Sequence, residues 1–505
     1  MIRLYTVVFL SGAALMGLEI AGSRVMAPVF GTSIFVWGSL ITTFLASLAA
    51  GYALGGRLAD RRPRASLLGG ILVGAGLLVW LPLARPAPLL ALCAAAPVPD
   101  RFQALLAALL LFALPSVLMG AVSPFAMRLA AREVGTIGRT AGSLAALSTA
   151  GSIVGTFSMT FLFIPAFPIE PILFGVGATL VLCGAFASRD GLPGRLGFAA
   201  AGLAAAAAVF LVRPERVPSP VPDGTVVFRK ETAYHRLLVV DQGPRRVLFF
   251  NNLAQGFVSR SSGMATGRVY SDGLAASLLF RKAPARNAFV IGLGTGMLPR
   301  LLSERAPEIA TTSVEIDPEV VRVAGEYFGF RPDANDRVLV GDGRTVLERE
   351  RGPWDAIILD AYFSDSLPFH LTTREFLELC RERLSPDGVF SANFVGTLMG
   401  KEQRLFWSFV RTAREVFPTV AILSAELSSG KPVFQSNAIL VASPSRDRLS
   451  KERVVAEGDR LAAALHHPPI AEWALEYHEG ELRTDEVPVL TDSFSPTDAL
   501  QHLGR

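Results

Sequence analysis

The sequence predicts a multi-pass α-helical membrane domain followed by an α/β domain, in which a small antiparallel β-subdomain precedes a doubly wound parallel sheet. Composition predicts the first part, because 51% of the 505 residues are hydrophobic and only 18% are charged, which is too apolar for one soluble protein. Strand-like and helix-like segments alternate after residue 287, and this alternation predicts a parallel sheet with crossover helices.

Long apolar runs fill the first part of the chain. A helix needs about 20 apolar residues to cross the ~30 Å hydrocarbon core of a bilayer. Seven such runs fall at 4–27, 33–56, 66–84, 102–127, 140–164, 169–187 and 196–212. The first run is too long for a signal peptide and contains Glu19 and Arg24, so we expect it to be retained. We therefore predict a transmembrane domain of about seven helices over residues 1–212, multi-pass in the cell membrane, with the lipid bilayer as its partner.

The charges are distributed unevenly between the two parts. Up to residue 213 there are 14 arginines and 6 acidic residues, a net charge of +8, which leaves 34 of the 48 basic and 38 of the 44 acidic residues, net −4, for the rest. This asymmetry is typical of membrane proteins and gives no support to a nucleic-acid partner. Arginines cluster after the second, fourth and sixth runs, which places those loops in the cytoplasm. If all seven runs span the membrane, the C-terminal part lies outside the cell. If the Ala-rich last run, 196–212, lies along the membrane interface instead, the C-terminal part stays in the cytoplasm.

A change of composition separates the two parts. Four prolines between Arg213 and Asp223 predict a stiff extended linker over residues 213–224. Alternating apolar residues then predict strands of a small antiparallel β-subdomain within residues 225–265. Its strands are expected at 225–228, 236–240 and 246–250. The doubly wound domain is expected over residues 266–445, with a C-terminal extension over 446–505.

A glycine-rich turn follows the first strand of the doubly wound domain. The sequence Gly292-Leu293-Gly294-Thr295-Gly296 comes directly after the predicted strand 288–291 and opens a helix that runs to about Arg305. Its glycines let a ligand approach the helix N-terminus. The third glycine of the dinucleotide fingerprint would fall on Met297, which favours a site of the adenosylmethionine type over one for NAD.

Acidic residues end the next three predicted strands. Glu315 lies 23 positions after Gly292, where a carboxylate can accept two hydrogen bonds from a ribose diol. Asp342, between Gly341 and Gly343, can accept a hydrogen bond from the exocyclic amine of adenine, and Asp360 ends the fourth strand. The strands themselves are expected at 311–314, 337–340 and 354–359. Because ligands bind at the carboxyl edge of such sheets, we expect one nucleoside site at this edge.

These motifs, in this order, resemble those of the spermidine synthase (polyamine aminopropyltransferase) family, in its form fused to a membrane domain. The resemblance covers about residues 225–445. The motifs are Glu231-Thr232-Ala233-Tyr234-His235, Leu253-Ala254-Gln255, Tyr270, the glycine turn, Val314-Glu315-Ile316-Asp317, Gly341-Asp342-Gly343 and Asp360. In the membrane part, the stretch Gly56-Arg57-Leu58-Ala59-Asp60-Arg61 resembles a loop signature of major-facilitator transporters.

The resemblance implies a Rossmann-like fold of the adenosylmethionine-dependent transferase type, with a nucleoside site and an amine site. The residues implied for the nucleoside are His235, Gly292, Gly294, Gly296, Glu315, Asp342, Gly343 and Pro368, and those implied for the amine are Gln255, Tyr270 and Asp365. The resemblance also implies decarboxylated S-adenosylmethionine as co-substrate, a small amine or polyamine such as putrescine as acceptor, and a homodimer. No metal is expected, because His466-His467 lacks partner ligands.

Asp360 falls on the catalytic aspartate of that family, and the chemistry explains why a carboxylate is needed. An amine with a pKa near ~10 is protonated at neutral pH and cannot attack, so a base must take its proton. Attack of the bound amine then displaces the thioether, which is already a good leaving group, and correct positioning supplies much of the rate. We therefore expect Asp360 to be the base.

Several positions depart from the family pattern and keep other functions open. Thr295 stands where the synthases have an aspartate, Asp365 comes two residues later than the second acid of the family's Asp-x-x-Asp motif, and Ser271 replaces the His or Gln that follows the tyrosine. One alternative is therefore a methyltransferase that uses S-adenosylmethionine. A second alternative is a polyamine transporter or sensor with a non-catalytic nucleoside-binding domain. Residues 490–496 resemble a tail element of the fused forms and are expected to cap the domain.

Overall fold

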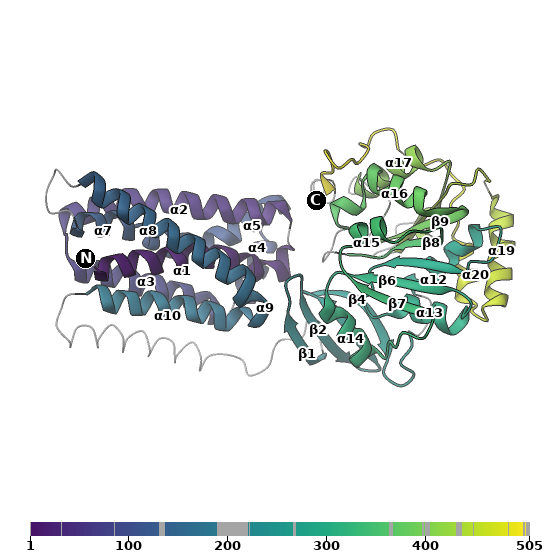
Figure 1. Ribbon diagram of the computed structural model, residues 1–505, viewed down its shortest axis with the longest axis horizontal. Coiled ribbons are helices and arrows are strands. Elements are labelled where there is room, and N and C mark those ends of the chain that lie inside the picture. The colour runs from purple at the N-terminus through teal and green to yellow at the C-terminus, as the bar shows by residue number, and fades with distance from the viewer. Residues whose placement is uncertain are drawn as a thin grey trace. The chain divides into compact units, whose positions relative to one another are not determined.

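The chain folds as two compact units (Figure 1), one of Met1–Pro218 with Lys230–His235 and the other of Ser219–Arg229 with Arg236–Arg505. The computed structural model describes residues 2–31, 33–84, 86–130, 137–188, 221, 223–265, 269–362, 367–395, 398, 404–430, 437–447, 449–482, 484–497 and 500.

The first unit is helical. Its elements are α1 (Ile2–Phe30), α2 (Ile34–Arg61), α3 (Ala65–Ala84), α4 (Pro86–Ala94), α5 (Asp100–Ala108), the π-helical η1 (Leu109–Ala113), α6 (Leu114–Gly120), α7 (Val122–Ala130), α8 (Ile137–Ser158), the π-helical η3 (Met159–Phe163), α9 (Ile164–Ala166) and α10 (Ile169–Ala187). Each of the first six apolar runs is helical, and the seventh, 196–212, lies outside the described residues.

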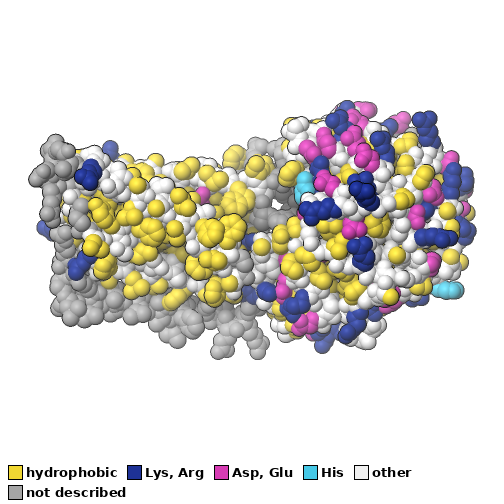
Figure 2. All heavy atoms as spheres, in the orientation of Figure 1, with side chains coloured by type: hydrophobic (Ala, Val, Ile, Leu, Met, Phe, Trp, Pro, Cys, Tyr) yellow, Lys and Arg dark blue, Asp and Glu magenta, His cyan; other side chains and the backbone are white. Residues whose placement is uncertain are grey.

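Five helical stretches among the described residues are long and apolar enough to cross a membrane. They are Ile2–Phe30, Ile34–Arg61, Phe102–Ala130, Ile137–Phe163 and Ile169–Ala187. Apolar side chains also cover the face of this unit seen in Figure 2. On α8 the exposed residues include Ile153, Val154 and Phe157. An exposed apolar surface of this kind is typical of helices that face lipid, which agrees with a multi-pass membrane protein.

Glycines allow the helices of this unit to pack closely. A Cβ atom at Gly151 or Gly155 of α8 would overlap the backbone of α1 at Phe9 or Ala13. Gly69 of α3 and Gly184 of α10 approach each other in the same way. Small residues at such crossings let helix backbones come into van der Waals contact, which drives helix association in membranes.

The second unit contains two sheets. Its strands are β1 (Thr225–Glu231), β2 (Arg236–Gln242), β3 (Arg245–Phe250), β4 (Leu253–Ser259), β5 (Asn287–Ile291), β6 (Ala310–Glu315), β7 (Asp336–Val340), β8 (Trp354–Leu359), β9 (Leu384–Val395), β10 (Thr419–Leu423) and β11 (Asn437–Ser443). The helices are α12 (Tyr270–Ala276), η4 (Ser277–Phe280), α13 (Met297–Arg305), α14 (Pro318–Phe328), α15 (Gly343–Arg349), η5 (Phe369–Leu371), α16 (Arg374–Arg383), α17 (Arg404–Val416), α18 (Ala425–Ser429), α19 (Lys451–Ala464) and α20 (Pro469–Ala474).

The larger sheet has the strand order β10-β11-β9-β8-β5-β6-β7. The strands from β9 to β7 are parallel, and β11 runs antiparallel to both β9 and β10. The smaller sheet has the order β1-β2-β3-β4. The predicted fold class is therefore confirmed, with the difference that β11 makes the large sheet mixed. Residues 437–443 are mostly apolar, as a buried parallel strand would be, so their sequence does not indicate an antiparallel strand. The direction of β11 depends instead on the connection through α17, β10 and α18.

Helices cover both faces of the large sheet. Phe289 and Ile291 of β5 belong to a core that includes Phe376 of α16 and Phe409 of α17. The alternate residues of β5, with Val290 among them, pack with α12, α13, α19 and α20 on the other face. In the smaller sheet, one face packs against α14. Burial on both faces explains the apolar runs of the central strands β5 and β8.

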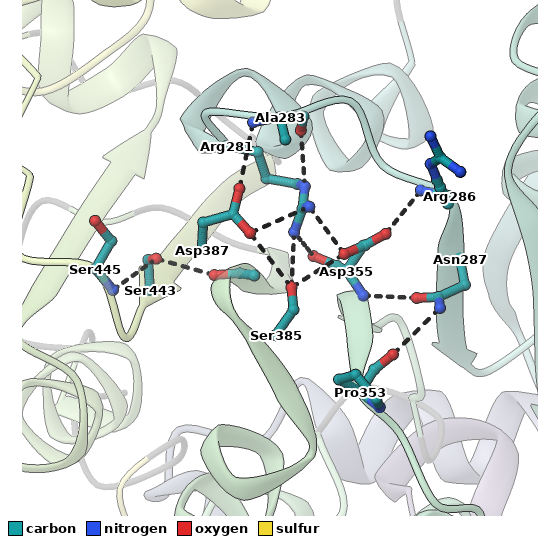
Figure 3. Close-up of polar contacts among 11 residues, drawn as sticks. Arg281, Ala283, Arg286, Asn287, Pro353, Asp355, Ser385, Asp387, Ser443 and Ser445 are labelled. Carbon is teal, nitrogen blue, oxygen red and sulfur yellow. Dashed lines mark hydrogen bonds and ion pairs between the residues drawn. The ribbon is translucent and has the colours of Figure 1, made fainter.

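A buried ion cluster fixes the edge of the large sheet at which β8 and β9 begin (Figure 3). Arg281, only 7% exposed, pairs with Asp355 of β8 at 2.8 Å and with Asp387 of β9 at 3.3 Å. Its guanidinium also donates to the Asp355 carbonyl oxygen (2.9 Å) and to Ser385 (3.2 Å). The Arg286 N–H donates to Asp355 as well, at 2.8 Å. These contacts join the segment between η4 and β5 to β8 and β9, at the edge opposite the ends of the strands that carry the predicted site.

Candidate active site

The predicted ligand residues follow four neighbouring strands at one edge of the large sheet. Backbone hydrogen bonds join the ends of these strands: Asp360 N–H donates to Ile291 (2.8 Å), Gly292 to Val314 (2.8 Å) and Gly341 to Glu315 (2.9 Å). β5 lies between β6 and β8, so the chain leaves β5 where the strand order reverses. Crevices at such points are where ligands bind in open α/β sheets.

The turn after β5 requires its three glycines for its backbone conformation. Gly292, Gly294 and Gly296 have φ angles of 98°, 54° and 75°, values that L-residues with side chains rarely adopt. A Cβ at Gly292 would overlap the Asp360 backbone, and one at Gly296 would lie 2.5 Å from the Phe330 ring. A Cβ at Gly294 would meet no atom within 4 Å. The turn is therefore packed on two sides and open at Gly294, where a ligand can approach.

Glu315 is buried and holds this turn. One carboxylate oxygen accepts the Leu293 N–H at 3.0 Å, and the other accepts the Asp317 N–H at 3.0 Å. Burial raises the pKa of Glu315, while hydrogen bonds from the Asp317, Leu293 and Gly294 N–H groups oppose this shift. Each carboxylate oxygen has a second lone pair, so the side chain can order the turn and still accept hydrogen bonds from a diol.

Asp342 caps α15 and pairs with a histidine. Its carboxylate accepts the Thr345 N–H at 2.9 Å and lies 2.7 Å from His370 Nε2. Burial raises the pKa of Asp342, but the hydrogen bonds from Thr345 and His370 outweigh it and the net shift is downward. A Cβ at Gly343 would overlap the Ile291 side chain, so this glycine lets α15 pack closely against β5.

Asp360 lies among hydrogen-bond donors at the end of β8. Asn393 Nδ2 donates to its carboxylate at 3.1 Å, and the Tyr270 hydroxyl also bonds to it. Burial raises the pKa of Asp360 to about 7, against the opposing effect of Asn393 and Tyr270 and with a further rise from the charge of Glu315. Burial and the neighbouring Asp360 keep the pKa of Tyr270 well above 10, so the phenol stays a donor at neutral pH.

Two further residues orient Asn393, which our sequence reasoning did not select. Asn437 Nδ2 donates to Asn393 Oδ1 at 2.8 Å, and the Tyr362 hydroxyl donates to the Asn393 carbonyl oxygen at 2.8 Å. Asn393 is 2% exposed in a strand that is otherwise largely apolar. Such a buried amide in an apolar strand is the sequence signal that could have identified it, because buried polar groups need partners.

The remaining predicted residues lie in several places. The Gln255 carbonyl oxygen of β4 is 3.3 Å from the Tyr270 hydroxyl, and Pro368 is half-buried directly before η5. His235 lies between β1 and β2, in the stretch that belongs to the first unit, and burial lowers its pKa to about 3. Asp365 lies outside the described residues. Thr295 is buried next to Gly256 of β4.

Within the described ranges no group of three or more His, Cys, Asp or Glu side chains could hold a metal ion. The expectation that the site needs no metal stays a prediction. The structure also brings His370 to Asp342, a contact that our sequence reasoning did not predict.

Comparisons with known proteins agree with the motifs. The model of the spermine/spermidine synthase domain matches residues 268–442. A polyamine aminopropyltransferase from Vibrio vulnificus is 33% identical over 237 residues, 45% of this chain and 73% of that protein. An N-terminal histidine N-methyltransferase from Emericella nidulans is 35% identical over 138 residues, 26% of this chain and 24% of that protein. Among solved structures, a probable spermidine synthase from Corynebacterium glutamicum matches with 20% identity and a TM-score of 0.43, covering 55% of this chain and 98% of that one.

Proposed function

Because the chain belongs to the spermine/spermidine synthase (polyamine aminopropyltransferase) family, we propose that it transfers an aminopropyl group from decarboxylated S-adenosylmethionine to an amine such as putrescine and releases methylthioadenosine. The observation that carries this proposal is Asp360, a carboxylate with a pKa of about 7 that is held by Asn393 and Tyr270 at the end of β8. A base whose pKa lies near the working pH suits proton transfer from an amine.

In the proposed reaction, the nitrogen lone pair of the amine forms a bond to the aminopropyl carbon attached to sulfur. The bond between that carbon and sulfur breaks, its electron pair goes to sulfur, and the sulfonium becomes a neutral thioether. Asp360 takes the amine proton and later releases it to water. One pKa unit is worth ~1.4 kcal/mol, so moving the proton from an amine of pKa ~10 to a base of pKa ~7 costs about 4 kcal/mol, against about 8 kcal/mol for an ordinary aspartate.

Each side of the proposed site has its own supporting residues. On the nucleoside side, Glu315 is proposed to bind the ribose and Asp342 the adenine amine, next to the open face of the turn at Gly294. On the amine side, Tyr270 contacts both Asp360 and the Gln255 carbonyl oxygen. His235, Gly343, Pro368 and Asp365 remain proposed ligands on the strength of the family resemblance.

The helical unit is proposed to anchor the enzyme in the cell membrane. Its five long apolar stretches support this reading, with a membrane domain over residues 1–212 and a linker over 213–224. The β-subdomain is proposed over 225–265, the catalytic domain over 266–445 and its extension over 446–505. A homodimer is a further proposal that follows from the family.

Methyl transfer from S-adenosylmethionine is a second candidate function. The observation that favours it is the buried Thr295, which occupies a position where the synthases carry an acid for a cationic nitrogen. A site that lacks this acid binds a positively charged nitrogen of the donor or of a polyamine acceptor less tightly. The similarity over 138 residues to a protein named as an N-terminal histidine N-methyltransferase also supports this candidate.

Product analysis distinguishes the two candidates. The detergent-purified full chain is incubated with S-adenosylmethionine or its decarboxylated form and a panel of di- and polyamines, and products are identified by mass spectrometry. The proposal predicts methylthioadenosine and an amine heavier by one aminopropyl unit. Adenosylhomocysteine as the product would replace the proposal by methyl transfer. No product from either donor would favour a non-catalytic binding role.

Variants of two aspartates test the assignment of the base. Asp360→Asn is expected to reduce product formation by at least about a thousandfold, because amide nitrogen and oxygen accept a proton far less readily than a carboxylate. Asp485→Asn, which makes the same change at an exposed residue of the C-terminal extension, is the matched control and is expected to retain activity. Full activity in Asp360→Asn would exclude Asp360 as the base.

A further inference from the structure

Residues 490–496, the tail segment, lie against the start of α16. Leu490 is fully buried, its carbonyl oxygen accepts the Arg374 N–H at 2.8 Å, and its N–H donates to Thr412 Oγ1 of α17 at 2.9 Å. Thr491 and Phe494 then close a short turn through two backbone hydrogen bonds of 2.9 and 3.0 Å. The tail segment is therefore an ordered part of the second unit, for which the sequence predicted only a capping role.

Asp492 is the residue of the tail segment with the most polar contacts to the rest of the domain. Its two carboxylate oxygens each accept a hydrogen bond of 2.7 Å from Arg344, and one of them also accepts a hydrogen bond of 2.8 Å from Thr373. Its N–H donates to the Glu375 carboxylate at 2.9 Å. The hydrogen bonds from Arg344 lower the pKa of Asp492, so the carboxylate is ionised at neutral pH. A two-pronged arginine–carboxylate pair fixes direction as well as distance.

Arg344 connects this pair to the nucleoside side of the candidate site. It is the second residue of α15, two positions after Asp342, and it also donates to the His370 carbonyl oxygen at 3.2 Å. The imidazole of His370 in turn contacts Asp342 at 2.7 Å. Thr373, the other partner of Asp492, caps the N-terminus of α16. Asp492 thus fixes the two segments that carry Asp342 and His370.

We propose that the tail segment holds the nucleoside side of the active site in its binding geometry, with Asp492 as the positioning residue that acts through Arg344 on the His370–Asp342 pair. The ligand affected is the adenine nucleoside part of donor and product. Asp342 can accept a hydrogen bond from the adenine amine only in a fixed direction, and that direction depends on the cap of α15 and on His370. The inference rests on the proposed function for the identity of the nucleoside.

The test measures equilibrium binding, which does not depend on turnover. Dissociation constants for methylthioadenosine and for adenosylhomocysteine are measured by calorimetry on the detergent-purified full chain, in the wild type and in Asp492→Asn, Asp492→Glu and Arg344→Lys. Asp492→Asn and Arg344→Lys are expected to weaken binding of the nucleoside that the wild type prefers by about tenfold, because each removes charge-assisted hydrogen bonds that hold the start of α15. Asp492→Glu keeps the charge and is expected to recover part of the affinity. Asp485→Asn is the matched control.

The outcomes separate a positioning role from mere stabilisation. Weaker binding of Asp492→Asn, with an unfolding temperature close to that of the wild type and a larger change in KM for the donor than in kcat, supports the proposal. An unchanged dissociation constant overturns it. Weaker binding that follows a lowered unfolding temperature equally in the Asn and Glu variants also overturns it, because that result indicates stability alone.

The same data distinguish failure of this inference from failure of the proposed function. If the wild type forms an aminopropylated product and Asp492→Asn binds the nucleoside normally, the inference fails and the proposed function stands. If the wild type forms no such product but its nucleoside affinity depends on Asp492, the proposed function fails and the inference stands.

Discussion

Asn393 donates a hydrogen bond to Asp360 across 3.1 Å, from the end of β9 to the end of the neighbouring strand β8. The amide of Asn393 stabilises the ionised carboxylate, whereas burial destabilises it. Burial has the larger effect, so the pKa of Asp360 is raised to about 7. Since Asn437 and Tyr362 hold Asn393 in turn, the protonation state of the proposed base depends on a hydrogen-bond network of β9, β11 and the segment that follows β8.

The first prediction concerns the pH dependence of the wild-type reaction. If Asp360 must be ionised to take the amine proton, kcat/KM falls about tenfold per pH unit below ~7 and is flat from there to the pKa of the amine, ~10. A pH profile of kcat/KM with the purified full chain measures this. An acid limb near the ordinary aspartate pKa of ~4 would show that another group, or an unperturbed aspartate, controls the reaction.

The second prediction concerns Asn393. The hydrogen bond from Asn393 lowers the pKa of Asp360, so Asn393→Ala should raise that pKa by about 0.5–1 unit, given a net hydrogen-bond contribution of about 1 kcal/mol. The acid limb then moves to higher pH and kcat/KM at about pH 7 falls by about 2- to 5-fold. Activity at about pH 9 should recover most of the wild-type value, because Asp360 is ionised there in both proteins. A loss that is equal at every pH would indicate a distorted site instead.

The third prediction concerns the ion cluster at the opposite edge of the sheet. Arg281→Ala leaves the carboxylates of Asp355 and Asp387 without their buried partner and should lower the free energy of unfolding by about 3 kcal/mol. Lys282→Ala is the matched control, because the Lys282–Asp447 pair is more than half exposed on both sides and such pairs are worth less than about 1 kcal/mol. Denaturant unfolding of the full chain measures both. Nucleoside affinity of the folded Arg281→Ala protein should match that of the wild type.

Sequence reasoning identified the parts of the fold and site that depend on local pattern. The strands β5 and β8, the glycine turn and the acids Glu315, Asp342 and Asp360 follow from apolar runs and from the residues that end them. The assembly of strand ends at one edge then follows from parallel topology. The direction of β11 was not predictable in this way, because a buried strand has the same apolar pattern whether it runs parallel or antiparallel to its neighbours.

The contacts missed by sequence reasoning join residues that are distant along the chain. Asp492 is 148 positions from Arg344, and His370 is 28 positions from Asp342. Asp492 lies in the tail element that the sequence singled out, but nothing in the local sequence distinguishes it from a surface acid, or His370 from a packing histidine. Such pairings depend on tertiary structure, and without an observed fold the tail segment could be assigned only a capping role.

The fourth prediction concerns the crossing of α1 and α8. Gly155→Leu would force a side chain into the backbone of α1 at Ala13 and should separate the two helices, since overpacking costs about 1–3 kcal/mol or more. Gly142→Leu, on the same helix but with open space around a Cβ, is the matched control. Thermal unfolding in detergent is expected to show a lower midpoint for Gly155→Leu only. Equal midpoints in the two variants would mean that this crossing does not contribute to stability.

The fifth prediction connects catalysis with stability at Asp360. The folded-state pKa of Asp360 is raised to about 7 from an ordinary value of 3.8, so its contribution to stability is fully present below about pH 4 and is lost as the pH rises to ~7. Asp360→Asn has no charge to bury. The variant should therefore gain stability relative to the wild type as the pH rises from about 4 to about 7, by about 4 kcal/mol in all, after which the difference should stay constant. Unfolding midpoints of the two proteins across this range measure the effect. A variant that is less stable than the wild type at about pH 8 would mean that the ionised carboxylate holds the site together, and that burial does not determine its pKa.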